Sequence, residues 1–510
     1  MQKTLLSLAL TAILTCTANA SPIPFIDHAK FTVKSSKIIN KLKRASIENY
    51  VNSNELDLSD GGVEDSDIPR IITYLQNHPA INALNLANNF DLTSGAMAKL
   101  ATVTTLTALN LARDFKDCEN NICTGGLEGK DTLAFANNTS LTYLNLYNNS
   151  IGDEGAINIA KNPHLTILDV SANNISDLGG QALAQNKLLE ELDLGENEGI
   201  TSKTALALSE NTALHHLELQ QTKVDDEGAI ALASKLRLDY LALGEDNITD
   251  KSAQAFADNT TIEDLDLAGT KMTADGAVIL SKNTVIDKLD FSGDFFGSPR
   301  ANDIGDKGAI ALAQMKNLSQ LYLSSQQVTK LGAEALGKTH LYDLDLSANY
   351  DLGDAGAAEL ANINWVSLDL SACSLSDKGA ESLAKTDFLY LFAQANFISD
   401  AGVTALSNRV YAVLDLTENE IRDEGAFALA KSGAMQALLV SYNRISVIGV
   451  AALVHSHIPY LEIGEQAPLS AQLHKSVRVH AKRKFCYRET NKLRCVSKDA
   501  VVLPAQKKLR

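Results

Sequence analysis

Aromatic residues are scarce in this chain of 510 residues: Phe, Trp and Tyr together make up 5% of it, although hydrophobic residues make up 45%. The core must therefore be built from aliphatic side chains, mostly Leu, Ala and Ile. After the first 20 residues, no stretch reaches the roughly 18 uncharged apolar residues that a membrane-spanning helix needs. The hydrophobic content is nevertheless ample for folding, so we expect the bulk of the chain to be ordered.

The sequence also lacks the short motifs that accompany common catalytic sites. It contains no Gly-x-Gly-x-x-Gly after a strand, no His-Glu-x-x-His and no Gly-x-Ser-x-Gly. Of the adjacent His215 and His216, one is expected to point inward and the other to lie next to the core. Neither is expected to have a matching partner for catalysis nearby. A glycosidase needs an acid whose pKa is raised in a desolvated pocket, and we expect the acidic surface of this chain to be too open to water for that. We therefore predict no catalytic residue and no cofactor.

Cysteine is rare, and only five cysteines follow the first 20 residues. Cys373 stands alone and is expected to be a small buried hydrophobe. The other four form two close pairs, and the second pair ends the stretch CYRETNKLRC, which is typical of a hairpin around a polar turn. A zinc site needs four convergent ligands and His480 is the only nearby histidine, so two local disulfides are favoured over a metal. The paired cysteines are Cys118 with Cys123 and Cys486 with Cys495.

The first 20 residues, MQKTLLSLALTAILTCTANA, have the layout of a secretory signal peptide. Lys3 precedes an apolar run at 5–14, and the small residues Ala18 and Ala20 frame a cleavage site after Ala20. Export delivers a protein to an oxidising compartment, which agrees with disulfide formation. We therefore predict a periplasmic or secreted protein, with a lipid-modified Cys16 as the alternative.

A pattern of the form Leu-x-x-Leu-x-Leu-x-x-Asn recurs along most of the chain. Examples are LTYLNLYNN from residue 141, LTILDVSAN from 165, LEELDLGEN from 189 and LYDLDLSAN from 341. Most copies lie 23 to 25 residues apart, after a degenerate start at Leu56. The first leucines of the Leu-x-Leu pairs are Leu84, Leu109, Leu144, Leu168, Leu192, Leu217, Leu241, Leu265, Leu289, Leu321, Leu344, Leu368, Leu391, Leu414, Leu438 and Leu461.

Each unit reads as a strand, a turn and a helix. The Leu-x-Leu alternation has period two and marks a short strand with one buried face, whereas the Gly-Ala-x-x-Leu-Ala run that follows has helical period. Stretches such as IGDKGAIALA and IRDEGAFALA repeat because small residues let neighbouring helices pack closely. One unit cannot bury its own leucines, so stacking predicts an α/β solenoid of about 16 repeats, a curved horseshoe with a concave parallel β-sheet and convex helices. The residues expected to bond their amides to backbone groups along the stack are Asn149, Asn173, Asn197, Asn349, Asn396, Asn419 and Asn443.

This pattern resembles the leucine-rich repeat family over roughly residues 51–465, and its Gly-Ala-x-Ala-Leu-Ala helices are similar to those of the ribonuclease-inhibitor-like class, which includes bacterial proteins with GALA motifs. The resemblance implies a scaffold that binds a protein partner. Plant-pathogen GALA effectors carry an N-terminal F-box, and residues 21–50 show no Leu-Pro-rich start of that kind. Ran GTPase-activating proteins share the repeat class but have an acidic C-terminal stretch that is absent here, so a regulator of that type is the weaker alternative.

Both ends of the array differ from its middle, as expected of caps that keep apolar surface from water. From residue 466 on, 12 Lys and Arg residues stand against 2 acidic residues, whereas the whole chain carries a net charge of −17. This basic segment favours an anionic envelope polymer or lipid, or a hairpin against the acidic last repeats, over nucleic acid. The predicted domains are a signal peptide at 1–20, a helical cap at 21–50, a repeat array at 51–465 with insertions near 114–131 and 295–303, and a basic C-terminal cap at 466–510.

Residues that flank the buried leucines must point to the concave side because side chains alternate along a strand. The residue after each central leucine is mostly acidic, so the concave face should attract cationic partners, although solvation alone also accounts for much of this pattern. Inward aromatic residues and the rim insertions add candidate contacts. The predicted partner-binding residues are Tyr143, Tyr147, Asp193, Glu218, Tyr240, Asp266, Asp290, Phe295, Phe296, Tyr322, Asp345, Asp369, Tyr390 and Phe392.

The sequence therefore predicts an exported bacterial leucine-rich repeat protein, a monomer that binds a protein ligand through its acidic concave face and its rim loops. The prediction includes a role as an effector or host-interaction factor. The rival from a different class is an envelope-associated structural protein, tethered by its basic C-terminal segment.

Overall fold

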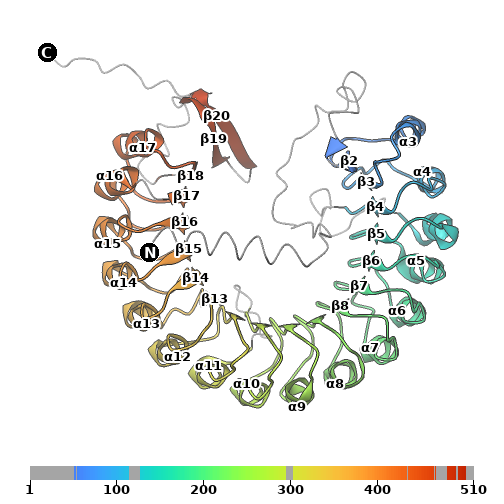
Figure 1. The fold of residues 1–510 in the computed structure, drawn as a ribbon, viewed down its shortest axis with the longest axis horizontal. Helices are drawn as coiled ribbons and strands as arrows, with labels where there is room; N and C mark the ends of the chain where they lie inside the picture. The colour runs from blue at the N-terminus through green and yellow to red at the C-terminus, as the bar shows by residue number, and fades with distance from the viewer. Residues whose placement is uncertain are drawn as a thin grey trace. The chain divides into compact units, whose positions relative to one another are not determined.

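The computed structural model describes residues 51–500 except 53, 114–126, 294–301, 433–434, 465, 467–478 and 490–491, and all described residues belong to one compact unit, Ser35–Arg510. The predicted signal peptide, the N-terminal cap and most of both insertions lie outside the described residues. Within the described part, short strands and helices alternate along the chain. Successive units stack into an open horseshoe with the strands inside and the helices outside (Figure 1).

Strands β2 to β18 form one parallel sheet, and each strand pairs with the next one in the chain. Leu56 lies opposite Leu84, Leu84 opposite Leu109, and the central leucines continue in this register to Leu461. The predicted leucine positions and the parallel sheet are therefore confirmed, and the degenerate start at Leu56 is a full strand. The strands are β2 (Glu55–Asp57), β3 (Ala83–Asn85), β4 (Ala108–Asn110), β5 (Tyr143–Asn145), β6 (Ile167–Asp169), β7 (Glu191–Asp193), β8 (His216–Glu218), β9 (Tyr240–Ala242), β10 (Asp264–Asp266), β11 (Lys288–Asp290), β12 (Gln320–Tyr322), β13 (Asp343–Asp345), β14 (Trp365–Asp369), β15 (Phe388–Phe392), β16 (Tyr411–Asp415), β17 (Met435–Leu439) and β18 (Tyr460–Glu462).

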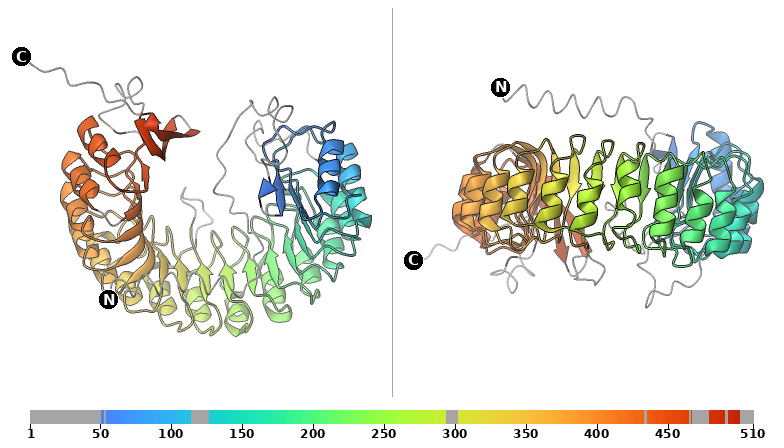
Figure 2. Two further views of the ribbon diagram at one scale, coloured as in Figure 1. Left: turned by 45° about the horizontal axis from the view of Figure 1, so that its top comes forward. Right: turned by 90° about the horizontal axis from the view of Figure 1, so that it is seen from below.

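The helices form a single outer layer, which Figure 2 shows from two further sides. Several of them begin at a Ser or Thr whose hydroxyl accepts the backbone N–H two residues on, as Ser376 does from Lys378, because this cap satisfies an amide that has no partner within the helix. The helices are α3 (Ile68–Asn77), α4 (Ser94–Leu100), the 3-10 helix η3 (Gly129–Asn137), α5 (Gly152–Ile159), α6 (Asp177–Ala184), α7 (Ser202–Leu208), α8 (Asp226–Lys235), α9 (Ala253–Asp258), α10 (Ala274–Leu280), α11 (Gly305–Leu312), α12 (Lys330–Leu336), α13 (Gly353–Leu360), α14 (Asp377–Leu383), α15 (Asp400–Leu406), α16 (Asp423–Lys431) and α17 (Val447–Val454).

Two antiparallel pairings close the described sheet at its ends. β1 (Val51–Asn52) pairs with β2, and β19 (Val479–Glu489) pairs with β20 (Lys492–Ala500). The backbone of β19 also pairs with β18 at one position. The hairpin expected around CYRETNKLRC is therefore confirmed at the level of the backbone.

The core is a continuous layer of aliphatic side chains between the sheet and the helices. Central leucines such as Leu144, Leu217 and Leu344 are fully buried, as are Leu146, Leu219 and Leu346, which stand two residues further on. Burial of each leucine stabilises the fold by about 1.5 to 3 kcal/mol, so this stack is the largest favourable contribution. The scarcity of aromatic residues agrees with a core of uniform aliphatic layers.

Asparagine side chains join each turn to the neighbouring unit. The amide nitrogen of Asn197 donates to the carbonyl of Val170 in the preceding unit at 3.1 Å and to that of Leu194 at 2.9 Å. Its amide oxygen accepts the N–H groups of Asn173 and Ile175, both at 2.9 Å. The same contacts recur from unit to unit, so the predicted structural role of the repeated asparagines is confirmed. We call this set of residues the asparagine ladder.

The ladder position tolerates other residues that keep a polar contact. Cys373 is buried as predicted, but it occupies a ladder position, where its thiol donates to the carbonyl of Leu346 at 3.0 Å. Gln466 occupies the last ladder position: its amide donates to the carbonyl of Val440 and accepts the N–H of Ile445. The ladder therefore extends one residue beyond the predicted boundary at 465.

A second set of bonds joins the helix side of each unit to the next. Asp354 accepts the N–H of Ser376 at 2.7 Å, its hydroxyl at 2.6 Å and the N–H of Gly379 at 2.9 Å. A Cβ at Gly379 would lie 2.6 Å from the carboxylate oxygen of Asp354, so glycine is needed at this place in the motif. The aspartates that bond the start of the following helix in this way, here called the aspartate braces, are Asp65, Asp153, Asp177, Asp226, Asp250, Asp306, Asp354, Asp377, Asp400 and Asp423.

We predict that Asn349→Ala lowers the free energy of unfolding by at least about 2 kcal/mol, because it leaves buried backbone groups without partners. Asn349 donates to the carbonyls of Leu323 and Leu346 and accepts the N–H groups of Gln326 and Val328. Chemical denaturation followed by circular dichroism measures the change. The exposed Asn408→Ala is the control and should change stability by less than about 0.5 kcal/mol. Equal effects of the two substitutions would contradict the ladder's role.

We also predict that Gly402→Ala destabilises the array by about 1 to 3 kcal/mol. A Cβ at this position would lie 2.7 Å from the carboxylate oxygen of Asp377 and 2.9 Å from the Cβ of Ala380. Alanine otherwise favours helices over glycine, so a stabilising effect is expected wherever such crowding is absent. A thermal midpoint equal to or above that of the unmodified chain would show that the brace does not require glycine.

Candidate binding face

The inner face of the sheet carries two columns of side chains. The first column contains the residue before each central leucine, and the second column contains the residue after it. On β7, for example, Glu191 and Asp193 flank the buried Leu192, and both are partly buried by their neighbours. Both columns line the concave side of the horseshoe, as the alternation of side chains requires.

Most aspartates of the second column close the turn that follows their own strand. The carboxylate of Asp369 accepts the N–H of Ser371 at 2.7 Å, and that of Asp266 accepts the N–H of Ala268 at 2.8 Å. Asn145 does the same with Tyr147 at 2.8 Å. One oxygen of each of these side chains therefore serves the fold.

Burial and like charge act together on the carboxylates near β7. Desolvation raises the pKa of Asp193 well above its ordinary value, and the neighbouring carboxylates of Asp169 and Glu218 raise this pKa further. The register places these residues side by side on β6, β7 and β8. Negative charge is therefore concentrated on the inner face at a cost to the folded state.

The same environment occurs at two further places. Burial, followed by the charge of Asp290, raises the pKa of Asp266 to about 7, and burial with the charge of Asp345 raises the pKa of Asp369 to about 7. The expectation that this face is too open to water to raise a carboxyl pKa is therefore wrong. The reason is that burial removes much of the water around each of these carboxylates.

The first column holds an ordered aromatic pair. The ring of His216 stacks on that of Tyr240, with 4.1 Å between centroids and 5° between planes, and His216 Nε2 lies 3.1 Å from Glu218 Oε1. The expectation that the two adjacent histidines lack partners is wrong. His215 does not lie next to the core either, because its side chain is 43% exposed and its Nδ1 lies 3.8 Å from Asp239 Oδ2.

Lys288 is the only lysine or arginine among the described strand residues of the two columns. Its Nζ lies 3.0 Å from Asp264 Oδ2 and 5.9 Å from the centroid of the Tyr322 ring. The hydroxyl of Tyr322 donates to Asp343 Oδ2 at 2.9 Å. A cation, a tyrosine and two carboxylates are thus joined across neighbouring strands.

The remaining predicted residues fall at different places. Tyr143 lies in the first column, where burial raises its pKa to about 12, and Tyr147 lies in the turn after the same strand. Tyr390 and Phe392 flank the buried Leu391 on β15, both partly exposed. The rim phenylalanines at 295 and 296 lie outside the described residues, so their binding role stays a prediction.

His216 and Lys288 could have been found from the sequence. The residue before each central leucine faces the same side as the residue after it, so the first column carries as much information as the second. Aligning that column places His216 next to Tyr240, and Lys288 between Asp264 and Gln320.

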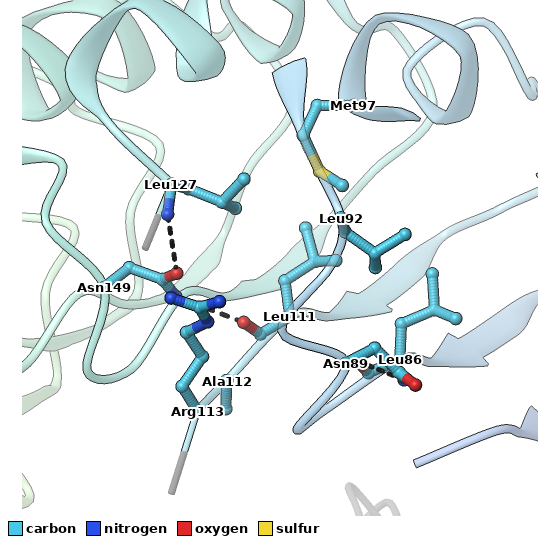
Figure 3. A pocket seen from close by; sticks show the side chains of 9 residues that line it. All are labelled: Leu86, Asn89, Leu92, Met97, Leu111, Ala112, Arg113, Leu127 and Asn149. Carbon is cyan, nitrogen blue, oxygen red and sulfur yellow. Dashed lines mark hydrogen bonds between the residues drawn. The ribbon is translucent and has the colours of Figure 1, made fainter. Parts of the chain in front are cut away.

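A small cleft of about 240 Å³, including its open mouth, lies near β3 to β5 (Figure 3). Asn149 accepts the N–H of Leu127 on its wall at 3.1 Å, and the Arg113 side chain donates to the carbonyl of Phe90 at 2.9 Å. Burial lowers the pKa of the Arg113 guanidinium. The polar groups of the wall are engaged with the chain itself, so the cleft is a packing irregularity of the ladder. It is lined by Leu86, Asn89, Leu92, Met97, Leu111, Ala112, Arg113, Leu127 and Asn149.

Other types of site receive no support within the described residues. No group of three or more His, Cys, Asp or Glu side chains there is arranged to hold a metal ion. None of the helices in that part of the chain has the length and apolar character needed to cross a membrane. The backbone register places Cys486 opposite Cys495, while Cys118 and Cys123 lie outside the described residues. Both disulfides remain predictions.

We predict that Asp369→Asn stabilises the array at about pH 8 by about 1 kcal/mol or more, but not at about pH 4.5. The folded-state pKa of Asp369 is raised to about 7, so its favourable contribution is complete below the unfolded pKa and is lost as the pH rises through 7. Asparagine keeps the oxygen that accepts the N–H of Ser371. Urea denaturation at the two pH values measures the difference.

The control is the brace substitution Asp377→Asn, which should have the opposite sign. Burial raises the pKa of Asp377, but hydrogen bonds from Ser399 and Gly402 outweigh it and lower the pKa below its ordinary value. Its contribution to stability is present above the unfolded pKa and is lost as the pH falls through the folded pKa. A destabilising Asp369→Asn at about pH 8 would show that the inner-face charge supports the fold.

Comparison with known proteins agrees with the geometry. A leucine rich repeat model matches residues 163–224, and a model of two leucine rich repeat copies matches residues 139–185. A third leucine rich repeat model matches residues 258–281, 300–313, 364–384 and 413–430. Among curated proteins, none matches the chain.

Several solved structures are similar in fold. An internalin from Listeria monocytogenes is 22% identical, with 64% of this chain and 81% of that chain covered and a TM-score of 0.37. The yeast Rad7 and Elc1 complex contains a chain that is 16% identical, with 76% and 86% covered and a TM-score of 0.42. The functional domain of InlJ from Listeria monocytogenes is 17% identical, with 76% and 74% covered and a TM-score of 0.40.

Similarities with such low sequence identities and TM-scores say nothing about the function of this chain. The matched repeats lie on the strands and helices described above, and the central leucines of every described unit share one register. Leucine-rich repeat proteins are in general non-catalytic scaffolds for protein interactions. The matched models and the stacked sheet together establish that this chain carries leucine-rich repeats and folds as an α/β leucine-rich-repeat horseshoe.

Proposed function

We propose that this chain is a non-catalytic scaffold that binds a protein partner on the inner face of its sheet. The observation that carries the proposal is the composition of that face: partly buried carboxylates and tyrosines lie in register on the concave side of one parallel sheet. Large side chains with few rotatable bonds lose little entropy when a partner binds, which makes them effective anchors.

The aromatic end of the face supplies the strongest candidate anchors. Tyr390 and Phe392 lie on the same strand, and the register places Val413 and Asp415 beside them on β16. All but the buried Asp415 are partly exposed. An apolar surface that borders carboxylates is typical of the centre and rim of a protein interface.

The cellular setting is part of the same proposal. The layout of residues 1–20 supports export to the periplasm or beyond, and the Gly-Ala-x-x-Leu-Ala helices support a place in the ribonuclease-inhibitor-like class with GALA motifs. An effector or host-interaction role follows only if the partner is a host protein. A Ran-GTPase-activating-like regulator is the weaker alternative.

The rival function is an envelope-associated structural protein that is held by its basic C-terminal segment. The observation in its favour is the charge after residue 466, where 12 Lys and Arg residues stand against 2 acidic residues. Neutralising Lys507, Lys508 and Arg510 by serine tests this rival without removing the hairpin that pairs with β18. Release from the envelope with unchanged partner capture would favour the rival.

We predict that Tyr390→Ala and Phe392→Ala each weaken partner binding by about 2 kcal/mol, or roughly 30-fold in Kd. The mature chain serves as bait in a pull-down from extracts, mass spectrometry identifies the partner, and titration calorimetry measures the affinities. Leu178→Ala is the matched control, because Leu178 is 62% exposed on the helical side. Unchanged affinity of both inner-face variants, with unchanged melting curves, would remove this end of the face from the interface.

A further inference from the structure

The turns below the strands do not need negative charge. Asp266 closes its turn by accepting the N–H of Ala268 at 2.8 Å, and Asn145 closes the equivalent turn by accepting the N–H of Tyr147 at 2.8 Å. An asparagine therefore supplies the acceptor that the fold requires. The charge at the aspartate positions is additional to what the turn uses.

This additional charge is unfavourable for the folded chain. Asp266 and Asp290 are neighbours in register on β10 and β11, and Asp345 and Asp369 are neighbours on β13 and β14. Adjacent parallel strands lie about 4.8 Å apart, so these carboxylates repel one another in a partly desolvated setting. Within the described residues, none of the four forms an ion pair. Features that oppose stability in an otherwise regular fold concentrate at functional surfaces.

The chain contains its own example of a cation on this face. Lys288 holds its ammonium group 3.0 Å from Asp264 Oδ2 and 5.9 Å from the ring centroid of Tyr322. A carboxylate on β10 and an aromatic ring on β12 thus receive one lysine side chain from the strand between them, with charge pairing and a cation–π contact together. Around Asp193 and Tyr240 the strand between them carries Glu218 and His216, and the ring of His216 stacks on that of Tyr240.

The length of the acidic row indicates the form of the ligand. From β6 to β14 the second column spans about 38 Å at about 4.8 Å per strand, which corresponds to roughly a dozen residues of extended chain. A small cation would fill one gap between carboxylates, whereas an extended polypeptide reaches all of them. Two residues interrupt the row: the buried Ala242, between Glu218 on β8 and Asp266 on β10, and Tyr322 on β12.

We propose that the second column from β6 to β14 binds an extended, lysine- and arginine-rich segment of the partner protein, with the carboxylates pairing its cations and the ring of Tyr322 contacting an apolar stem. This proposal rests on the proposed function and names its partner class. Three observations carry it: charge in excess of what the turns use, the run of carboxylates in register, and the arrangement of Lys288.

The test uses the full chain and a fluorescent nine-residue peptide in which lysine alternates with alanine. Fluorescence anisotropy at about 50 mM salt should show saturable binding that weakens steeply at about 300 mM salt, because screening shortens the reach of the charges. A peptide with serine in place of each lysine should not bind. Binding of both peptides alike, or of neither, would overturn the proposal.

The double variant Asp266→Asn with Asp290→Asn should weaken lysine-peptide binding at least tenfold, since it keeps the turn acceptors and removes two charges. Its melting temperature is measured alongside and should not fall. The matched control is Glu227→Gln with Glu424→Gln, which removes the same charge from exposed first turns of α8 and α16. Less than a twofold change is expected for this control. If both double variants weakened peptide binding equally, the loss would follow from the change in net charge alone. That result would contradict a binding site on the sheet.

The chain's own basic segment is the competing occupant. If the full chain binds the lysine peptide only after Lys507, Lys508 and Arg510 are replaced by serine, the C-terminal segment occupies the face and the proposal of a partner segment fails. If the peptide does not bind in either form while the chain still captures a protein through Tyr390 and Phe392, this inference fails and the proposed function stands.

Discussion

The structure depends on hydrogen bonds that side chains of one unit make to the backbone of the next. Stacked strands satisfy most of their own polar groups, but every unit also contains a turn and a helix start whose N–H and C=O groups are buried between neighbours. The asparagine ladder supplies partners on the strand side, where Asn197 reaches back to Val170. The aspartate braces supply them on the helix side, where Asp354 reaches forward to Ser376. Leucine burial stabilises the stack, but these polar contacts fix how one unit sits on another.

The fold could be predicted from the sequence because its two strongest signals are local and repeated. Leu-x-Leu at a nearly constant spacing fixed both the strands and their register, as the alignment of Leu84 with Leu109 shows. The hydrogen bonds of the repeated asparagine to the backbone could be predicted for the same reason. The braces could not be predicted as a specific interaction, because the partner of each aspartate lies in the following unit and the motif within one unit indicates only a helix start.

The candidate site was less predictable because its properties arise between strands. The burial of Asp369 depends on the neighbouring strands β13 and β15, so the sequence of its own repeat does not predict it. The pairing of Lys288 with Asp264 and Tyr322 likewise appears only after three strands are placed in register. The second column predicts the charge of the face. It does not predict the stacking of His216 on Tyr240 or the raised carboxyl pKa values.

The ladder and the braces run in opposite directions along the chain, the first from a unit to the one before it and the second from a unit to the one after it. A copied unit inserted anywhere in the array therefore finds a donor on one side and an acceptor on the other without any new residue. Duplication of whole repeats therefore preserves the hydrogen bonds at both junctions. The gain or loss of part of a repeat instead leaves either the ladder bonds or the brace bonds without a partner. The need to keep both sets of hydrogen bonds explains why the units have nearly constant length.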